Sequence, residues 1–412
     1  MVKVAVLGHG TVGSGVVELF TKNKESIAAR AGQELTVKRI LDLREFPELP
    51  YADKFTKNFD DILSDPEISI VAEVMGGLHP AFEYTKALLE AGKSVVTSNK
   101  ELVASKGAQL LAIAKAHNVN YFFEASVGGG IPVIRPMHQC LAANEITEVA
   151  GILNGTTNFV LTRMIHDSTP FDGALKEAQR LGYAERNPAV DVEGEDACRK
   201  ICILASLAFG SHVYPDTVHT EGITHLTLPD VEYAGSWDCV IKLIGRAKKL
   251  PDGKILAAVY PALLKSHSQL ANIDDVFNGI LIRGNATGDV VFYGRGAGKL
   301  PTASAVVADM IDISKAGCTS KSLTWCDSDG KNVGDYKEEP LQFMVRASLL
   351  DDRAQATVRD VMGEVTWLSR PSQPEDEVAF VTGRMSEYQL REKLEVLGNL
   401  LGVQSVTRAL DY

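Results

Sequence analysis

The stretch that decides the fold opens the chain: residues 2–13 read VKVAVLGHGTVG, an apolar run followed at once by Gly8-His9-Gly10-Thr11-Val12-Gly13. This is G-x-G-x-x-G spacing between a predicted strand and a predicted helix. The first glycine permits a tight turn, the second lets the backbone approach a pyrophosphate, and the third permits close helix–strand packing. Free N–H groups at the helix start would bind the phosphates. The sequence therefore predicts dinucleotide binding at Gly8, Gly10, Thr11, Val12 and Gly13.

The first 125 residues alternate between strand-like and helix-like patterns, which predicts a parallel sheet covered on both faces. Further strands are expected at residues 36–42, 69–74, 94–97 and 120–124, and helices at residues 11–30, 80–91 and 101–117. We therefore predict an α/β, Rossmann-type dinucleotide-binding domain over residues 1–130. Residues 294–320 are expected to pack back on it.

The acidic residue that binds the cofactor ribose in such domains lies about 20 residues after the glycines. The candidate here is Asp42, 34 residues after Gly8, and a polar loop over residues 23–33 would account for the longer spacing. Asp42 would favour NAD, because a carboxylate accepts from the 2′-hydroxyl and repels a 2′-phosphate. Arg44, and Lys38 or Arg39, would instead attract that phosphate. The alternative is that all four are solvated charges at the end of a strand, and the preference between NAD and NADP stays open.

Composition excludes several classes of protein. The 412 residues include 42 Lys+Arg and 53 Asp+Glu, a net charge of −11 without a basic cluster, which argues against nucleic-acid binding. No apolar run approaches the roughly 20 residues of a membrane span. The chain begins directly with a strand pattern rather than a secretory leader. Six scattered cysteines without a C-x-x-C pair indicate reduced thiols, and we expect a cytoplasmic protein.

Two further domains are expected. Strand and helix patterns follow in mixed order up to residue 326, which predicts an α+β substrate-binding and dimerisation domain over residues 131–326. A polar linker over residues 327–339 precedes a β-α-β-β-α-β pattern. That pattern predicts a small ferredoxin-like domain over residues 340–412.

Two polar segments of the middle region carry the chemistry. Asn154-Gly155-Thr156-Thr157-Asn158 reads as a polar turn after an apolar strand, and residues 182–200 are rich in acids. Asp196 and Lys200 stand four residues apart on a predicted helix and so share a face. Apolar neighbours would lower the pKa of Lys200 and suit it to proton transfer. On spacing alone, an ordinary surface ion pair is the favoured alternative.

Several stretches resemble the homoserine dehydrogenase family, in the family's order and over nearly the whole chain. They are TSNKELVA (97–104), EASVGGGIP (124–132), ILNGTTNFVLTRM (152–164), GYAERNPAVDVEGEDACRKICILA (182–205) and VFNGILIRGNATGDVVFYGRGAGKLPTASAVVAD (276–309). One departure is Asn187, where the family commonly has Asp before proline.

The resemblance implies an NAD(P)-dependent interconversion of L-homoserine and L-aspartate 4-semialdehyde, a step toward threonine, methionine and isoleucine. It assigns proton transfer to Lys200, with Lys100 as a second lysine near the reacting oxygen. The implied substrate residues are Glu185, Asp191, Asp196, Gly155, Thr156 and Tyr183. The implied cofactor residues, besides those above, are Thr97, Ser98, Lys100, Gly182 and Gly298. A zwitterionic amino acid requires carboxylates at its ammonium end, which agrees with this assignment.

The glycine-rich stretch after residue 124 is assigned a monovalent cation by the same resemblance, usually sodium. The implied ligands are the Glu124 carboxylate and the carbonyls of Val127, Gly129 and Ile131. A hinge between domains is an alternative reading of these glycines, and the two roles are compatible.

The final unit resembles an ACT domain, a module that binds amino acids, which implies threonine as an effector. The loop at residues 351–354 lacks the Pro-Gly often found where the ligand docks, and a role in assembly alone is the alternative. A homodimer or homotetramer is expected.

Two other functions remain to be weighed. A semialdehyde dehydrogenase would need an activated cysteine, and none of the six cysteines lies on a plausible strand–turn–helix elbow. A non-catalytic dinucleotide and amino-acid sensor would not need two lysines among three carboxylates and would usually carry a basic DNA-reading element. The sequence therefore favours the enzyme.

Overall fold

The computed structural model describes residues 1–316, 323–351 and 353–412. Cys318, the last part of the segment 294–320 and one residue of the loop 351–354 lie outside these described residues. The chain forms two compact units, each assembled from three stretches. The first unit comprises residues 1–149, 199–217 and 282–332, and the second comprises residues 150–198, 218–281 and 333–412.

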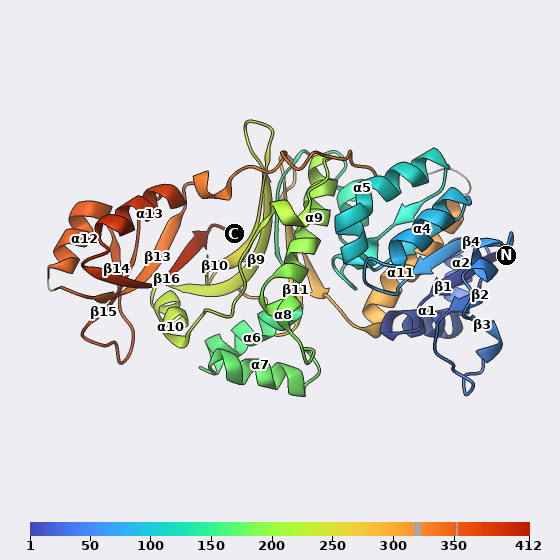
Figure 1. The fold of residues 1–412 in the computed structure, drawn as a ribbon, viewed down its shortest axis with the longest axis horizontal. Coiled ribbons are helices and arrows are strands. Elements are labelled where there is room, and N and C mark those ends of the chain that lie inside the picture. Colours follow the sequence, from blue (N-terminus) through green and yellow to red (C-terminus); the bar gives the residue numbers. More distant parts are fainter. Residues whose placement is uncertain (317–322, 352) are drawn as a thin grey trace. The chain divides into compact units, whose positions relative to one another are not determined.

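The first unit contains a six-stranded, all-parallel sheet in the order β3-β2-β1-β4-β5-β6 (Figure 1). Its strands are β1 (Val2–Leu7), β2 (Leu35–Leu41), β3 (Phe55–Thr56), β4 (Ile68–Glu73), β5 (Ser94–Thr97) and β6 (Tyr121–Phe122). The order reverses between β1 and β4, the point where doubly wound sheets bind nucleotides at the carboxyl ends of their strands. The predicted Rossmann-type domain is thus confirmed.

Helices surround this sheet: α1 (Thr11–Lys22), α2 (Lys24–Ala31), α3 (Asp60–Leu63), α4 (Ala81–Glu90), α5 (Lys100–Ala116) and α11 (Lys299–Ala316). The expected single helix over residues 11–30 and the polar loop over 23–33 were wrong. The helix breaks at Asn23, whose φ of −111° and ψ of 21° are not helical, and α2 follows. Helix α11 packs on α1, where a Cβ on Gly15 would come within 2.8 Å of the Lys299 carbonyl oxygen.

The second sheet is mixed, in the order β12-β11-β7-β9-β10-β16-β13-β15-β14, with the two-residue β8 (His219–Thr220) beside β10. Its strands before the tail are β7 (Ile146–Ile152), β9 (Cys239–Lys249), β10 (Ile255–Lys265), β11 (Phe277–Gly284) and β12 (Gly288–Arg295). Strands β9 and β10 pair antiparallel along their whole length. The accompanying helices are α6 (Gly155–His166), α7 (Phe171–Arg180), α8 (Ala189–Val192), α9 (Glu195–Phe209) and α10 (Leu228–Ser236).

The tail has the predicted β-α-β-β-α-β order: β13 (Gln342–Leu349), α12 (Ala354–Met362), β14 (Thr366–Leu368), β15 (Glu377–Val381), α13 (Glu387–Val396) and β16 (Leu401–Leu410). Its strands lie in the order β16-β13-β15-β14, which is a ferredoxin-like arrangement. Strand β16 also pairs parallel with β10, where Arg408 lies opposite Ala262. The tail strands therefore continue the sheet of the second unit.

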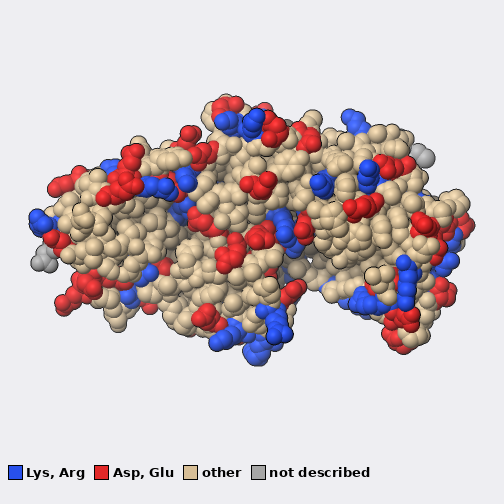
Figure 2. All heavy atoms as spheres, in the orientation of Figure 1, with Lys and Arg blue, Asp and Glu red and all other residues tan. Residues whose placement is uncertain are grey.

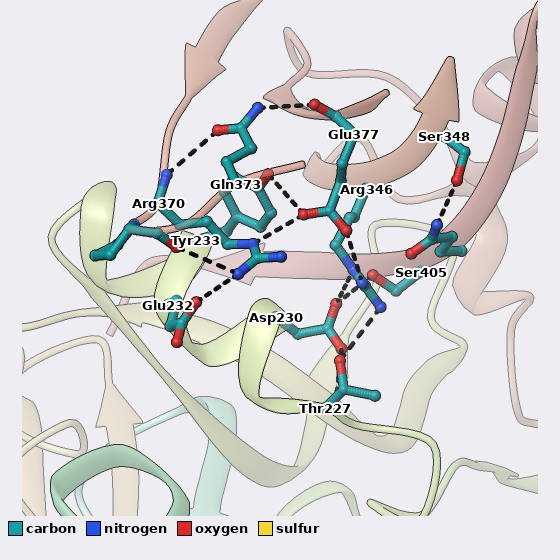
Figure 3. Close-up of polar contacts among 12 residues, drawn as sticks. Thr227, Asp230, Glu232, Tyr233, Arg346, Ser348, Arg370, Gln373, Glu377 and Ser405 are labelled. Atoms are coloured by element: carbon teal, nitrogen blue, oxygen red, sulfur yellow. Dashed lines mark hydrogen bonds and ion pairs between the residues drawn. The ribbon is translucent and has the colours of Figure 1, made fainter. Parts of the chain in front are cut away.

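A buried polar network fastens the tail to α10 (Figure 3). The Arg346 side chain of β13 donates to Asp230 at 2.9 Å and to Glu377 at 3.2 Å. Arg370 donates to Glu377 at 2.8 Å and to Glu232 of α10 at 2.9 Å. Such a network specifies one arrangement, because each buried charge needs its partner.

The surface carries charges of both signs. On the face shown in Figure 2, basic and acidic side chains lie interspersed. Within the described part of the chain, we find no helix with both the length and the apolar character that a membrane crossing requires.

Candidate active site

The glycine-rich turn has the geometry that the sequence predicted. Gly8 adopts a φ of +95°, and a Cβ on Gly13 would lie 1.9 Å from the Gly8 carbonyl oxygen, so no larger residue fits there. Around Gly10, by contrast, no described atom lies within 4 Å of a built Cβ. Helix α1 begins at the next residue without a side-chain cap. This open backbone at a helix N-terminus fits a dinucleotide pyrophosphate.

Asp42 lies directly after β2 and is tied to the same turn. Its Oδ2 accepts from the His9 backbone N–H at 2.8 Å, and both carboxylate oxygens accept from the Arg44 guanidinium at 2.9 Å. The Arg44 hydrogen bonds hold the pKa of Asp42 well below its usual range. A cavity of about 260 Å³, lined by Asp42, Arg44, Phe46 and Phe55 among others, adjoins this pair. The apolar side chains of Phe46 and Phe55 beside the Asp42–Arg44 ion pair suit the adenosine part of a dinucleotide.

The carboxyl ends of β4 and β5 hold a group that the sequence analysis missed. Glu73 is fully buried, and its Oε2 accepts from the Thr97 hydroxyl at 2.7 Å. Burial raises the pKa of Glu73 in spite of hydrogen bonds from Thr97 and the Met75 backbone. The sequence signal was an acid at the end of an apolar strand, followed by paired glycines.

Helix α5 starts immediately after this point. Asn99 caps it by accepting from the Leu102 N–H at 3.1 Å and donates to the Gly77 carbonyl at 2.6 Å. Lys100 is the first helical residue and is half-buried, and Ser98 precedes the cap. Both therefore sit at the carboxyl edge of the parallel sheet.

In the second unit, one amide brings two predicted substrate carboxylates together. Asn154 Nδ2 donates to Asp191 Oδ1 at 2.7 Å and to Asp196 Oδ2 at 2.8 Å. The Thr156 hydroxyl lies 3.0 Å from Asp191 Oδ2 and 2.7 Å from the Tyr183 carbonyl oxygen. Two converging carboxylates favour a cation such as a substrate ammonium group.

Asn154 was not among the predicted ligands, and residues 154–158 are not a turn. Gly155 and the next residues form the first turn of α6, and the Asn154 Oδ1 caps it by accepting from the Thr157 N–H at 2.9 Å. The amide oxygen of Asn154 thus accepts a hydrogen bond from the helix backbone, while its amide nitrogen donates to Asp191 and Asp196. An Asn before a helix was the signal available in the sequence.

Lys200 stands on α9, four residues after Asp196. The two residues are 6% and 2% exposed, in a helix whose neighbouring apolar side chains are buried. The i,i+4 spacing places both on one helix face. The alternative of an ordinary surface ion pair does not fit, because neither residue is at the surface.

Glu185 and Tyr183 lie in the loop after α7. The loop turns at Gly182, where φ is +77°, and Gln179 Nε2 donates to the Glu185 carbonyl at 3.1 Å. Glu185 is exposed, and the Tyr183 ring contacts Phe159 with centroids 5.2 Å apart. The loop backbone is thus fixed against α6, while the Glu185 side chain is accessible from outside.

The Glu124 carboxylate holds the glycine-rich turn together. It accepts backbone N–H bonds from Val133 at 2.7 Å, Ile134 at 2.8 Å and Arg135 at 2.8 Å. The Glu124 N–H donates to Asp309 of α11 at 3.0 Å. Burial and the nearby Glu124 charge raise the pKa of Asp309 to about 7, although Arg135 opposes this. Asp309 was not predicted.

The turn that follows Glu124 is tightly folded. Gly129 has a φ of +57°, and a Cβ on Gly128 would lie 2.4 Å from the Ile131 carbonyl oxygen. A Cβ on Gly129 would meet the Gly296 carbonyl oxygen at 2.3 Å. The carboxylate and backbone oxygens fit a hard cation in kind. Gly298, with a φ of +129°, ends the neighbouring loop, and its carbonyl accepts from Thr302 in α11.

A doubly wound parallel sheet with an open glycine turn is typical of the NAD(P)-dependent oxidoreductases, and the chain is one of them. Two family models match the chain: "Homoserine dehydrogenase, NAD binding domain" over residues 8–124 and "Homoserine dehydrogenase" over residues 132–311. The chain therefore belongs to the homoserine dehydrogenase family. The resemblance seen in the sequence is confirmed, and the sensor alternative is not favoured.

Two of three relatives match the chain over nearly its full length, and the third matches about three quarters of it. The chain is 37% identical to the homoserine dehydrogenase of Bacillus subtilis, across 98% of this chain and 96% of that protein. A homoserine dehydrogenase structure from Thiobacillus denitrificans superposes with a TM-score of 0.90 at 34% identity, covering 100% and 98% of the two chains. A hyperthermophilic archaeal homoserine dehydrogenase mutant solved with NADPH gives a TM-score of 0.65 at 28% identity, over 76% and 97%.

Proposed function

We propose that the chain interconverts L-homoserine and L-aspartate 4-semialdehyde, with Asp191 and Asp196 binding the substrate ammonium group and Lys200 moving the proton. The observation that carries this assignment is the bridge from Asn154 to both carboxylates, of which Asp196 lies one turn before the buried Lys200 on α9. Glu185, on the loop anchored by Thr156 and Tyr183, adds a third negative charge when substrate binds.

In the oxidation direction, the hydroxyl proton of homoserine passes to the neutral amine of Lys200. The C4–H bond breaks and a carbon–oxygen double bond forms. NAD(P), when bound, supplies the hydride acceptor. Lys100 polarises the reacting oxygen, and in the reverse direction the Lys200 ammonium returns the proton. The carboxylates act by fixing the orientation of the substrate.

The cofactor is assigned mainly to residues of the first unit, and of the residues named here Gly182 belongs to the second. Gly8, Gly10, Thr11, Val12 and Gly13 would hold the pyrophosphate, and Asp42 and Arg44 the adenosine ribose. The remaining cofactor residues are Thr97, Ser98, Lys100, Gly182 and Gly298. Arg44 supports acceptance of NADP because its guanidinium neutralises Asp42. The archaeal relative solved with NADPH supports the same reading.

A sodium ion is proposed at Glu124 and the carbonyls of Val127, Gly129 and Ile131. The support for this oxygen-only site is the burial of Glu124 beside the glycine turn, with a carboxylate that also accepts three backbone N–H bonds. Its role would be to stabilise the turn rather than to take part in the reaction.

We also propose a division of the chain into three domains. Residues 1–130 with 294–320 would form the cofactor domain, residues 131–326 the substrate-binding and dimerisation domain, and residues 340–412 an ACT-like domain with threonine as effector. The ferredoxin-like strand order of the tail supports the last assignment. We propose a homodimer or homotetramer. The scattered cysteines without a C-x-x-C pair support a cytoplasmic location.

A steady-state assay tests the proposal. The purified chain is given L-homoserine with NAD or NADP, with and without sodium and threonine, and the reduced nicotinamide is followed by absorbance. Turnover of homoserine is expected. 4-Hydroxybutyrate, which has the same alcohol but no amino group, is the matched control and should be oxidised far more slowly. Equal rates for the two alcohols would contradict the ammonium-binding role of the carboxylates.

A further inference from the structure

The last strand of the chain carries a buried arginine that the proposed mechanism does not use. Arg408 of β16 is 7% exposed, and its two terminal nitrogens donate to the two carboxylate oxygens of Glu221, both at 2.9 Å. The guanidinium lies over the Tyr260 ring, 4.6 Å from the centroid. A bidentate pair of this kind fixes both direction and distance.

Glu221 belongs to a short segment of the second unit, residues 219–224, whose first two residues form β8 beside β10. Its backbone N–H donates to the Val259 carbonyl at 2.8 Å, and its carboxylate lies 2.6 Å from His219 Nε2. Burial opposes ionisation, but the hydrogen bonds from His219 and Arg408 prevail and lower the pKa of Glu221 to about 2. The pair is therefore charged at neutral pH.

The same segment packs directly on residues 191–196, which carry Asp191 and Asp196 and are called the acidic turn below. Ile223 donates its N–H to the Val192 carbonyl at 2.8 Å. A Cβ on Gly222 would lie 2.2 Å from that same carbonyl oxygen, and a Cβ on Gly194 would lie 3.1 Å from the Glu221 carbonyl oxygen. The two backbones are thus in contact, with glycine on both sides.

Gly194 links the two substrate carboxylates. Its N–H donates to the Asp191 carbonyl at 3.0 Å, and its carbonyl accepts from Cys198 in the first turn of α9, where Asp196 lies. Its φ of +84° lies in the left-handed region that favours glycine. Because Gly194 is hydrogen-bonded to both neighbouring elements and packs on residues 219–224, a shift of that segment is expected to displace the two carboxylates.

We propose that Arg408 is a positioning residue of the substrate site: by fixing Glu221 it sets the backbone against which the turn carrying Asp191 and Asp196 is packed. This inference rests on the proposed role of those two acids. On this inference, a residue of the ACT-like tail helps to hold the amino-acid site in its geometry.

The arrangement around Arg408 offers an internal control. The guanidinium also binds Glu387 of the tail helix α13, at 2.7 Å. Glu221 connects Arg408 to the acidic turn, whereas Glu387 connects it only to the tail. Loss of the first partner should alter substrate binding, while loss of the second should alter only stability.

The test compares Glu221→Gln, Arg408→Lys and Glu387→Gln in the full chain, with homoserine KM, kcat and cofactor affinity measured for each. We expect Glu221→Gln to raise the homoserine KM about ten-fold or more, because small displacements of binding groups are costly. Arg408→Lys should give a smaller increase, since lysine keeps the charge but loses the bidentate geometry. Glu387→Gln should leave the KM nearly unchanged, and cofactor affinity should hold in all three.

Equal KM changes in Glu221→Gln and Glu387→Gln, or no change in Glu221→Gln, would overturn the inference. If Glu221→Gln does not fold, Arg408→Lys against Glu387→Gln gives the same comparison. Asp191→Asn separates this inference from the proposed function. If Asp191→Asn raises the homoserine KM while Glu221→Gln does not, only the positioning role fails. If Asp191→Asn has no effect, the substrate site itself is misplaced.

Discussion

Removal of the Arg346 charge should destabilise the second unit strongly. Arg346 is buried between α10 and the tail, where it donates to Asp230 at 2.9 Å, to Glu377 at 3.2 Å and to the Thr227 hydroxyl at 3.2 Å (Figure 3). Asp230 is 0% exposed. Arg346→Met keeps most of the aliphatic volume but leaves Asp230 buried without its cation.

The expected loss in the free energy of unfolding depends on which hydrogen bonds Asp230 keeps in the Arg346→Met variant. Breaking a buried ion pair by removing one partner costs about 3–5 kcal/mol. Asp230 still accepts from the Thr227 N–H at 2.9 Å, from the Thr227 hydroxyl at 2.6 Å and from Ser405 at 2.5 Å. Glu377 keeps Arg370 and Tyr233 as donors. We therefore expect the lower end, a loss of about 3 kcal/mol in the free energy of unfolding.

Urea unfolding followed by circular dichroism measures this loss as a shift of the midpoint, with the slope checked for a second transition. Arg353→Met is the matched control, because Arg353 also pairs with an aspartate at 2.9 Å but its side chain is 79% exposed. That variant should not move the midpoint. A shift for Arg346→Met as small as that of the control would refute the reasoning from burial.

Three further predictions concern the site. Glu185→Ala should raise the homoserine KM about ten-fold, because one carboxylate near the ammonium group is lost; an unchanged KM would remove Glu185 from the site. Asp42→Ala should shift the kcat/KM ratio toward NADP and Arg44→Ala toward NAD, and ratios that do not move would contradict their place at the ribose. Gly13→Ala should abolish cofactor binding in a fluorescence titration, because its Cβ would lie 1.9 Å from the Gly8 carbonyl oxygen; normal binding would contradict the tight turn.

Local pattern was sufficient for much of the fold. The alternation of apolar runs predicted every strand of the parallel sheet except the two-residue β3, and periodicity predicted α4, α5 and α9 within about two residues. The break at Asn23 was missed because both flanking segments are good helix formers, and only the backbone angle at that residue separates them.

Strand β9 and helix α10 were missed because tertiary contacts override their local signals. Strand β9 carries Lys242, which looks like a surface residue but is 0% exposed and donates to Asp274 at 2.9 Å. Helix α10 begins with a capping box between Thr227 and Asp230. Asp230 also accepts a hydrogen bond from Arg346 of the tail. A capping-box search would have found the start of the helix but not its second partner.

The sequence proposes candidate site residues one at a time, but it does not show their arrangement. Asn154 is hydrogen-bonded to Asp191 and Asp196, which lie 37 and 42 residues further along the sequence. Only the folded structure shows that these residues are in contact. Glu73 and Asp309 were missed for the same reason, since a carboxylate at an element's end reads as solvated until its burial is known.

The most direct test of the account is the turnover of Lys200→Ala with L-homoserine, measured beside its affinity for the reduced cofactor. If Lys200 moves the proton, kcat should fall by about a hundred-fold or more while cofactor affinity is nearly unchanged. A folded variant that keeps a kcat close to that of the parent enzyme would contradict the acid–base role of Lys200 and the mechanism built on it.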